Sequence, residues 1–405
     1  MKILHIIGSM DPASGGPCQG IRNSNPEMVI MGSSREVVSL DDPEAPFLGL
    51  DDFPIHALGP AKTVWQYSAK LKPWLIANYD RFDVIIINGI WIYSSYIGWE
   101  VIKVIRKKAS KDQNNKQTPK LFVMPHGMLD PYFQQAKNRR FKAIRNWIYW
   151  KIIENKVINE ADGILFTCET ELQLARKSFH PYHPKREINV GYGIIPPPVF
   201  SPNMYSEFIG KCPKVANEPY LLFFSRVHEK KGVDILIRAY AIIALQAQFE
   251  GKEMPKLVIA GPGLNTVFGK RMRRLAASYT DIQNWIIFPG MLKGEAKWGA
   301  LYSCEAFVLP SHQENFGIAI VEAMACAKPV LISNQVNIWV EVEADGGAVI
   351  ADDTLQGTKA MLKYWLDLNH KEQYKMGQQA LSTFKRHFHI KSSSALFLKS
   401  ISAST

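Results

Sequence analysis

Short apolar segments recur along this chain at intervals long enough for a helix between each pair. In the first half most of them are rich in Ile, Val and Leu and end in Gly, Ser, Asn or Pro; they lie at residues 2–9, 36–40, 83–88, 120–125, 163–168 and 188–192. Apolar strands that alternate with longer amphipathic stretches are typical of parallel sheets covered by helices on both faces. The pattern therefore predicts an α/β fold with a doubly wound sheet.

The pattern stops at Pro196-Pro197-Pro198 and resumes after a polar stretch that ends at Pro219. The second series of apolar segments lies at residues 220–225, 256–260, 285–289, 305–310, 329–333 and 347–350. A length of 405 residues also fits two domains. We expect two Rossmann-like domains that face each other across a cleft, and a helical tail that packs on the first domain. The predicted boundaries are 1–198, 199–375 and 376–405.

Composition narrows the class of protein. Apolar residues make up 47% and charged residues 21%, which is close to the average for globular proteins and excludes disordered and collagen-like chains. The five cysteines are widely spaced without a Cys-x-x-Cys pair, which argues against a disulfide framework or a structural zinc site and favours a reducing cytoplasm. The apolar run at the start of the chain is too short for a signal peptide. The segment 84–105 has the length of a membrane span, but Asn88, Glu100 and Lys103 within it are costly in a bilayer.

Residues 310–325 give the strongest indication of a site. They follow an apolar strand and become amphipathic from about Gly317, which predicts a helix N-terminus at the carboxyl edge of the second sheet. Open α/β sheets bind their ligands at this edge. The free amides of the first helical turn would face an anion there; they belong to Phe316, Gly317 and Ile318.

Two carboxylates and two cations accompany this helix N-terminus. Glu314 and Glu322 are eight residues apart, and Arg226 and Lys231 lie five apart in the loop after the first strand of the second domain. The two cations can converge on one anionic group. Helix capping and solvation are the alternative roles for the glutamates, and a basic surface turn is the alternative for the cations. Two anion-binding elements at one sheet edge favour a site.

Together these segments resemble glycosyltransferase family 4, whose members are retaining, nucleotide-sugar-dependent enzymes of GT-B fold. The resemblance covers nearly the whole chain and is strongest over residues 220–335, which contain Glu-x7-Glu, Pro-Ser-x-x-Glu-Asn-Phe-Gly and Glu-Ala-Met-Ala. It implies that Glu314 contacts the donor sugar and that Glu322 holds the ribose. It also implies that Arg226 and Lys231 neutralise the donor diphosphate.

The resemblance implies further contacts to the donor. His126, at the end of a strand, would meet the donor sugar near the reacting carbon, although a lone histidine is more often structural. Asp130 and Glu169 are weaker candidates for contacts to sugar or acceptor. The remaining predicted donor-binding residues are Gly15, Gly16, Met291, Leu292, Asn315, Phe316, Gly317 and Ile318.

The resemblance also implies a reaction: transfer of a hexose to a saccharide or polyprenyl-diphosphate-linked acceptor, with retention and through an oxocarbenium-like transition state. UDP-glucose is the first expectation for the donor, followed by UDP-galactose, UDP-N-acetylglucosamine and GDP-mannose. The chain has no Asp-x-Asp, and cationic side chains can replace a metal, so we expect neither metal nor cofactor. Asn337-Ile338-Trp339 looks like a signature of bacterial polysaccharide transferases. Ser225 and Ala327 stand where the family commonly has glycine.

The stretch 137–156 holds seven basic residues and one acid, Glu154, among the aromatic residues Phe141, Trp147, Tyr149 and Trp150. A basic aromatic helix can lie on an anionic membrane, such as the inner face of the plasma membrane. A helix packed by its aromatic residues, with a solvated basic face, explains the pattern equally well.

Other classes of protein remain open. The net charge of +11 would also suit a nucleic-acid-binding protein, but no such motif is present. A sugar-nucleotide epimerase of GT-B type shares the expected fold. Gly261-Pro262-Gly263 follows a strand as in an oxidoreductase, but Thr266 leaves the Gly-x-Gly-x-x-Gly pattern incomplete. No specific signal marks the pyridoxal phosphate lysine that a phosphorylase would need.

Overall fold

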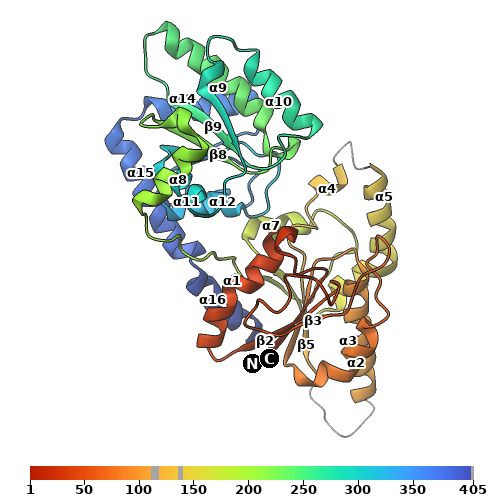
Figure 1. Cartoon of the computed structure of the whole chain (residues 1–405). Helices are drawn as coiled ribbons and strands as arrows, with labels where there is room; N and C mark the ends of the chain where they lie inside the picture. The colour runs from red at the N-terminus through yellow and green to blue at the C-terminus, as the bar shows by residue number, and fades with distance from the viewer. Residues whose placement is uncertain (111–117, 136–139, 403–405) are drawn as a thin grey trace. The chain divides into compact units, whose positions relative to one another are not determined.

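A computed structural model of the chain describes residues 1–110, 118–135 and 140–402. The chain divides into two compact units, Met1–Gly193 with Ile390–Thr405, and Ile194–His389. In Figure 1 the first unit contains both the red start and the blue end of the chain. The boundaries expected from the sequence were residues 198 and 375, so the second unit extends further at both ends than predicted.

The first unit is built on a parallel sheet of seven strands in the order β3-β2-β1-β4-β5-β6-β7. The strands are β1 (Lys2–Ile7), β2 (Ser34–Ser39), β3 (Ile55–Ala57), β4 (Val84–Asn88), β5 (Lys120–Met124), β6 (Gly163–Phe166) and β7 (Glu187–Asn189). The central strand β4 is buried at every position, as its run of Val and Ile requires when helices cover both faces. The six predicted strands are confirmed. The edge strand β3 has three residues and was not predicted.

The helices of the first unit are α1 (Gly16–Ile30), α2 (Leu71–Asn78), α3 (Tyr93–Ala109), α4 (Tyr132–Gln135), α5 (Arg140–Tyr149), α6 (Asn155–Glu160), α7 (Glu169–Ala175) and α16 (Ile390–Ser402). Shorter turns are η1 (Pro12–Ser14), η2 (Tyr79–Arg81) and the π-helical η4 (Trp150–Glu154). Helix α16 lies beside α1 (Figure 1). Its Leu398 and Ile401 join Ile3 and Met28 in one apolar cluster, so the end of the chain completes this core.

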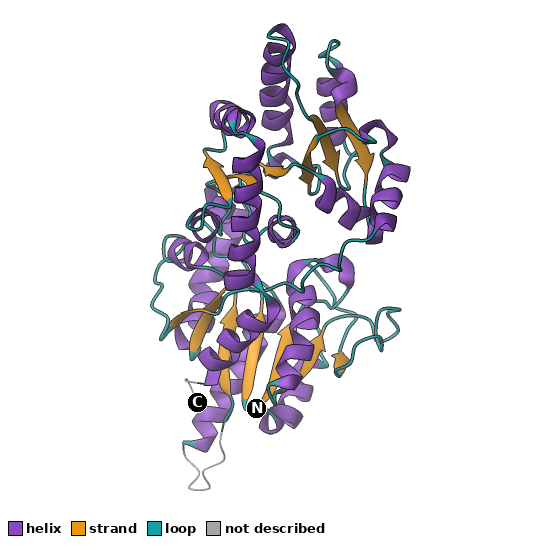
Figure 2. Ribbon diagram, turned by 90° about the vertical axis from the view of Figure 1, so that its left-hand side faces the viewer, coloured by secondary structure: helices purple, strands orange, loops and turns teal. Residues whose placement is uncertain are grey.

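The second unit contains a six-stranded parallel sheet in the order β10-β9-β8-β11-β12-β13. Its strands are β8 (Tyr220–Phe224), β9 (Lys256–Ala260), β10 (Ile286–Gly290), β11 (Ala306–Leu309), β12 (Val330–Ser333) and β13 (Ala348–Ala351). All six were predicted. In Figure 2 helices flank the strands in each unit, and the predicted fold class, two Rossmann-like parallel sheets with helices, is confirmed.

The helices of the second unit are α8 (Pro202–Lys211), α9 (Val233–Phe249), α10 (Val267–Ala277), α11 (Gly294–Ser303), α12 (Ile318–Ala325), α13 (Trp339–Glu343), α14 (Leu355–Asp367) and α15 (His370–Thr383). Shorter turns are η5 (Pro213–Val215), η6 (Glu229–Lys231), η7 (Gln283–Trp285) and the π-helical η8 (Phe384–Phe388). Across the described ranges, no helix has the length and apolar character needed to span a membrane. All five cysteines are described; they are buried, and none forms a disulfide bond.

Candidate functional site

Two loops at the carboxyl edge of the second sheet are joined by hydrogen bonds. The loop after β8 passes through η6, and the loop after β11 leads into α12. The amide of His312 and the hydroxyl of Ser311 both donate to the carbonyl oxygen of Lys230, at 2.8 Å each. Gly232 has a φ of 63°, and a Cβ there would collide with the carbonyl of Pro310. Glycine therefore allows the two predicted loops to lie against each other.

This contact brings Lys231 and Glu314 together. Lys231 is 6% exposed, and its ammonium group forms an ion pair with the Glu314 carboxylate. The Glu314 carbonyl accepts the amide of Asn337 at 2.9 Å, and the Asn337 side chain donates to Oδ1 of Asn315 at 3.1 Å. The segment 337–339 noted in the sequence thus holds the loop that presents Glu314.

Arg226, predicted to act with Lys231, is exposed at the start of the same loop. This start packs against residues 261–263. The Val227 amide donates to the Pro262 carbonyl at 2.8 Å, and a Cβ at Gly261 would collide with the carbonyl of Ser225. Close packing of two backbones accounts for the glycines of the Gly-x-Gly pattern without a dinucleotide.

The N-terminus of α12 lies directly after Glu314. Gly317 caps the helix with a φ of 77°, in the left-handed region that favours glycine. Phe316 is 7% exposed and packs edge-on against Phe388, with ring centroids 5.7 Å apart. Asn315 and Ile318 are half-buried beside it. The position of this helix start agrees with the sequence prediction. The Phe316 side chain is held in place by its contact with Phe388.

Glu322, one turn into α12, is paired with a residue that the sequence did not indicate. Its Oε1 accepts a hydrogen bond from Nζ of Lys297 on α11 at 2.5 Å. Burial raises the pKa of Glu322, and the neighbouring Lys297 opposes that rise. The predicted donor-binding residues Met291 and Leu292 follow β10. Met291 is half-exposed there, whereas Leu292 is 1% exposed, so only the backbone of Leu292 is available to a ligand.

In the first unit, the predicted Gly15-Gly16 loop precedes α1. Gly15 has a φ of 96° and lies in open space, so glycine is required there by the backbone angle rather than by crowding. Gly16 is the first residue of α1, and its carbonyl accepts the Tyr192 hydroxyl at 2.9 Å. The loop is therefore tied to the segment after β7.

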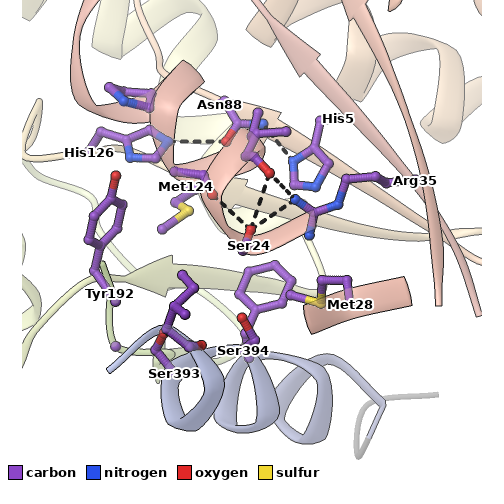
Figure 3. Close-up of a pocket in the computed structure, with 17 residues that line it drawn as sticks. His5, Ser24, Met28, Arg35, Asn88, Met124, His126, Tyr192, Ser393 and Ser394 are labelled. Carbon is purple, nitrogen blue, oxygen red and sulfur yellow. Dashed lines mark hydrogen bonds between the residues drawn. The ribbon is translucent and has the colours of Figure 1, made fainter. Parts of the chain in front are cut away.

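His126 follows β5 with a φ of 52°, an uncommon backbone angle for a residue other than glycine and one that clusters at functional sites. Nε2 of His126 lies 3.1 Å from Oδ1 of Asn88. A dashed line marks this hydrogen bond in Figure 3. The Asn88 amide nitrogen donates to the carbonyls of Ile6 and Ile86 and to Nδ1 of His5. These carbonyls only accept, so they fix the orientation of the amide and make His126 Nε2 the donor.

This hydrogen-bond chain sets the protonation of His126. Burial lowers the pKa of His126 to about 4, so the ring is neutral at pH 7. With the proton on Nε2, the Nδ1 atom carries a lone pair. Asn88 was predicted only as the end of a strand, because a single asparagine within an apolar segment gives no sequence signal of its own.

Glu171 is another residue that the sequence did not indicate. It is 4% exposed, and its carboxylate accepts the amide of Gly127 at 2.5 Å and that of Thr167 at 2.8 Å. It thereby joins the loop that carries His126 to the end of β6. The two weaker candidates lie nearby in sequence but differ: Asp130 is buried and accepts a backbone amide, whereas Glu169 is exposed at the start of α7.

Comparison with known proteins supports the resemblance. Residues 206–383 match the model of the family described as Glycosyl transferases group 1. A D-inositol 3-phosphate glycosyltransferase of Kineococcus radiotolerans is 27% identical over 163 residues, which are 38% of this chain and 37% of that protein. The serotype-specific mannosyltransferase WbdA of Escherichia coli is 28% identical over 117 residues, 29% of this chain and 14% of WbdA. These matches span well under two thirds of the relatives' length.

Among solved structures, Anabaena Alr3699/HepE in complex with UDP and glucose has the same fold. The TM-score is 0.73 with 17% sequence identity, and the superposition covers 100% of both chains. Identity at this level shows similarity of fold and no more. The family resemblance drawn from the sequence is confirmed by the family match within the second unit.

Proposed function

Because residues 206–383 form a domain of the glycosyl transferases group 1 family, we propose that the protein transfers a hexose from a nucleotide-sugar to a saccharide or lipid-linked saccharide acceptor. The observation that carries this proposal is the pairing of Lys231 with Glu314 at the N-terminus of α12. A nucleotide-sugar joins an anionic diphosphate to a neutral, hydroxyl-rich ring. A cation beside a carboxylate matches those two parts, because the cation binds phosphate and the carboxylate accepts hydrogen bonds from hydroxyl groups.

The proposed reaction breaks the bond between the anomeric carbon and the diphosphate oxygen and forms a bond to an acceptor oxygen on the same face. Lys231, Arg226 and the first amides of α12 stabilise the departing diphosphate. The leaving phosphate takes the proton of the acceptor hydroxyl. The first unit contributes His126, whose neutral ring offers Nδ1 to a sugar hydroxyl.

UDP-glucose is the first donor to test, because the similarly folded HepE of Anabaena binds UDP and glucose. We propose that no metal or cofactor is required, since Lys231 and Arg226 supply positive charge to the diphosphate. The proposal includes a role in polysaccharide synthesis on the cytoplasmic side of the membrane, because Asn337-Ile338-Trp339 resembles a signature of bacterial polysaccharide transferases.

Calorimetric titration with UDP, GDP and ADP in EDTA, then with their sugar conjugates, tests the donor site. We expect one nucleotide family to bind without metal and Glu322→Ala to weaken that binding. The matched control is Glu343→Ala, an exposed glutamate of α13. Product analysis then separates transfer to an acceptor from epimerisation. Absence of binding by every nucleotide would remove the basis of the proposal.

An outward apolar stripe on α5 and η4 supports a lipid-linked acceptor. Four side chains at helical spacing are 47% to 90% exposed: Phe141, Ile144, Ile148 and Ile152. Trp150 and Glu154, on the opposite side, are fully buried. Exposed cations flank the stripe: Arg140, Lys142, Arg145 and Lys151. Lys137 and Arg139 of the predicted basic stretch lie outside the described residues.

An apolar stripe bordered by cations is the pattern of a helix that lies in the interface of an anionic membrane. We expect binding to vesicles that contain phosphatidylglycerol and weak binding to phosphatidylcholine alone. The double variant Phe141→Ser and Ile148→Ser loses this binding, whereas Phe249→Ser, a 94% exposed phenylalanine of α9, retains it. Equal binding by all three proteins would contradict the proposal.

A further inference from the structure

A cavity in the first unit lies between α1, α16 and the sheet. Its volume is about 60 Å³. Its polar wall includes His5, Ser24, Arg35 and Ser394 together with Asn88 and His126, and apolar side chains come from both helices. Figure 3 shows Arg35 reaching toward Ser24, with Ser393 and Ser394 of α16 on the other side.

Arg35 is a buried cation without a paired carboxylate in the described part of the chain. It is 4% exposed; its Nη1 donates to the carbonyl of Ile21 at 2.6 Å and to Oγ of Ser24 at 2.9 Å, and its Nε has no partner. Arg22 of α1, in contrast, forms a two-pronged pair with Asp51 at 2.7 and 2.9 Å. Burial lowers the pKa of Arg35 to about 10, and the charge of Asp52 opposes this shift only in part.

Other groups at the cavity wall are hydrogen-bond donors as well. The chain through Asn88 makes Nδ1 of His5 an acceptor, so Nε2 of His5 carries the proton, and this Nε2 has no partner among the described residues. The hydroxyl of Ser394 is also buried without a partner there. The Ser24 hydroxyl donates to the carbonyl of Gly20, which leaves its oxygen to Arg35.

We propose that this cavity binds a phosphate or carboxylate group of a small molecule, with Arg35 as its counter-charge and His5 and Ser394 as further donors. A buried cation and unpartnered donors, with no carboxylate at the wall, favour a ligand group that carries negative charge and accepts hydrogen bonds, whereas Nδ1 of His126 can accept a hydrogen bond from the same ligand. The apolar wall of Met28, Met124 and Phe397 accommodates an aliphatic portion. The cavity lies within the first unit and is also lined by Asn88 and His126, so it adjoins the proposed sugar contact of His126. The binding test uses no sugar donor, so its outcome is separate from that of the proposed transfer.

Thermal unfolding of the full chain with inorganic phosphate, acetate or butyrate, each against NaCl at equal ionic strength, tests the proposal. We expect phosphate or the carboxylates to raise Tm saturably by about 2 to 4 °C at concentrations well above Kd. The phosphate and carboxylate arms tell the two sources of negative charge apart. Butyrate binding more tightly than acetate would show that the apolar wall takes part.

Arg35→Met abolishes the rise in Tm, whereas Arg273→Met, at an exposed arginine of α10, preserves it. Ser394→Leu, which keeps Arg35 but fills the cavity from α16, also abolishes it and covers the case in which Arg35→Met does not fold. A rise no larger than that with NaCl, or an equal rise in Arg35→Met and Ser394→Leu, overturns the proposal.

Discussion

The two polar clusters at the sheet edges, Lys231 with Glu314 and His126 with Asn88, differ in how their buried groups are stabilised. In the second unit, Lys231 and Glu314 are opposite charges held together by hydrogen bonds between their loops. In the first unit, His126 and Asn88 form a neutral chain in which no group carries charge at pH 7. A charged pair can exchange partners with an ionic ligand, whereas a neutral chain orients a ring. The first cluster to disturb is therefore the charged one.

Removal of the buried cation has the largest expected effect on that cluster. Lys231→Met leaves Glu314 without its partner and the diphosphate without its nearest positive charge. We expect kcat for hydrolysis or transfer of the donor sugar to fall about 10²- to 10³-fold, as for the loss of one charge-stabilising group. Lys230→Met, at the half-buried neighbour in the same turn, is the control and retains most of the activity. Equal losses in both would assign the effect to the turn rather than to the charge.

Loss of Lys297 tests whether the second charged pair also contributes to stability. Lys297→Met leaves the Glu322 carboxylate buried alone, and we expect the free energy of unfolding to fall by about 2 kcal/mol at pH 7. Without its partner the pKa of Glu322 rises further, so the folded state holds the proton more tightly. The loss is therefore smaller at pH 5 than at pH 8. Urea unfolding at both pH values measures it, with the exposed Lys293→Met as control.

Asn88→Asp replaces the neutral chain by a charged one. The new carboxylate raises the pKa of His126, which in the native protein lies near 4 rather than at its ordinary value of 6.5. A lowered histidine pKa means that acidification from pH 6.5 toward 4 favours the unfolded state, and Asn88→Asp weakens that trend. We expect about a 10-fold loss of kcat/KM from misoriented His126.

Nitrogen-15 NMR of the imidazole provides the direct measurement for this variant. The native His126 should show a neutral ring protonated on Nε2 that does not titrate above pH 5. Asn88→Leu, which removes the hydrogen bond without adding charge, should release the tautomer but leave the pKa low. Titration of His126 near pH 6.5 in the native protein would contradict the neutral chain.

The smallest expected effect is that of a change at Ala327. It tests whether backbone strain outside the proposed donor contacts affects stability without affecting activity. Ala327 has a φ of 57° just after α12, and the amide of Lys328 bonds back to the carbonyl of Ala323, as in a helix end that favours glycine. We expect Ala327→Gly to raise the free energy of unfolding by about 1 kcal/mol without changing activity. Thermal unfolding and a donor-turnover assay check both parts. The replacement of the family's common glycine by Ala327 therefore matters through the backbone angle and not through side-chain size.

The same two clusters show which site residues can be predicted from the sequence and which cannot. Glu314 and Glu322 stand in one continuous segment with recognisable neighbours, and Arg226 and Lys231 share one loop, so their placement followed from the pattern of strands. Lys297, Asn88 and Glu171 are single residues on separate elements. Each of them meets its partner only in the folded chain, so the spacing of neighbouring residues in the sequence could not predict these contacts. The helical tail was expected to pack on the first domain, and α16 does so, but the boundary lies at Ile390 rather than at residue 376, because helical periodicity does not show where the chain crosses from one core to the other.

The position of α16 has a consequence for biosynthesis. Leu398 and Ile401 pack in the core of the first unit, although nearly two hundred residues of the second unit precede them. During translation the second unit is complete as soon as residue 389 has left the ribosome, whereas the first waits for the residues that close its apolar cluster and one wall of its cavity. The amino-terminal half of the chain is therefore the last to finish folding.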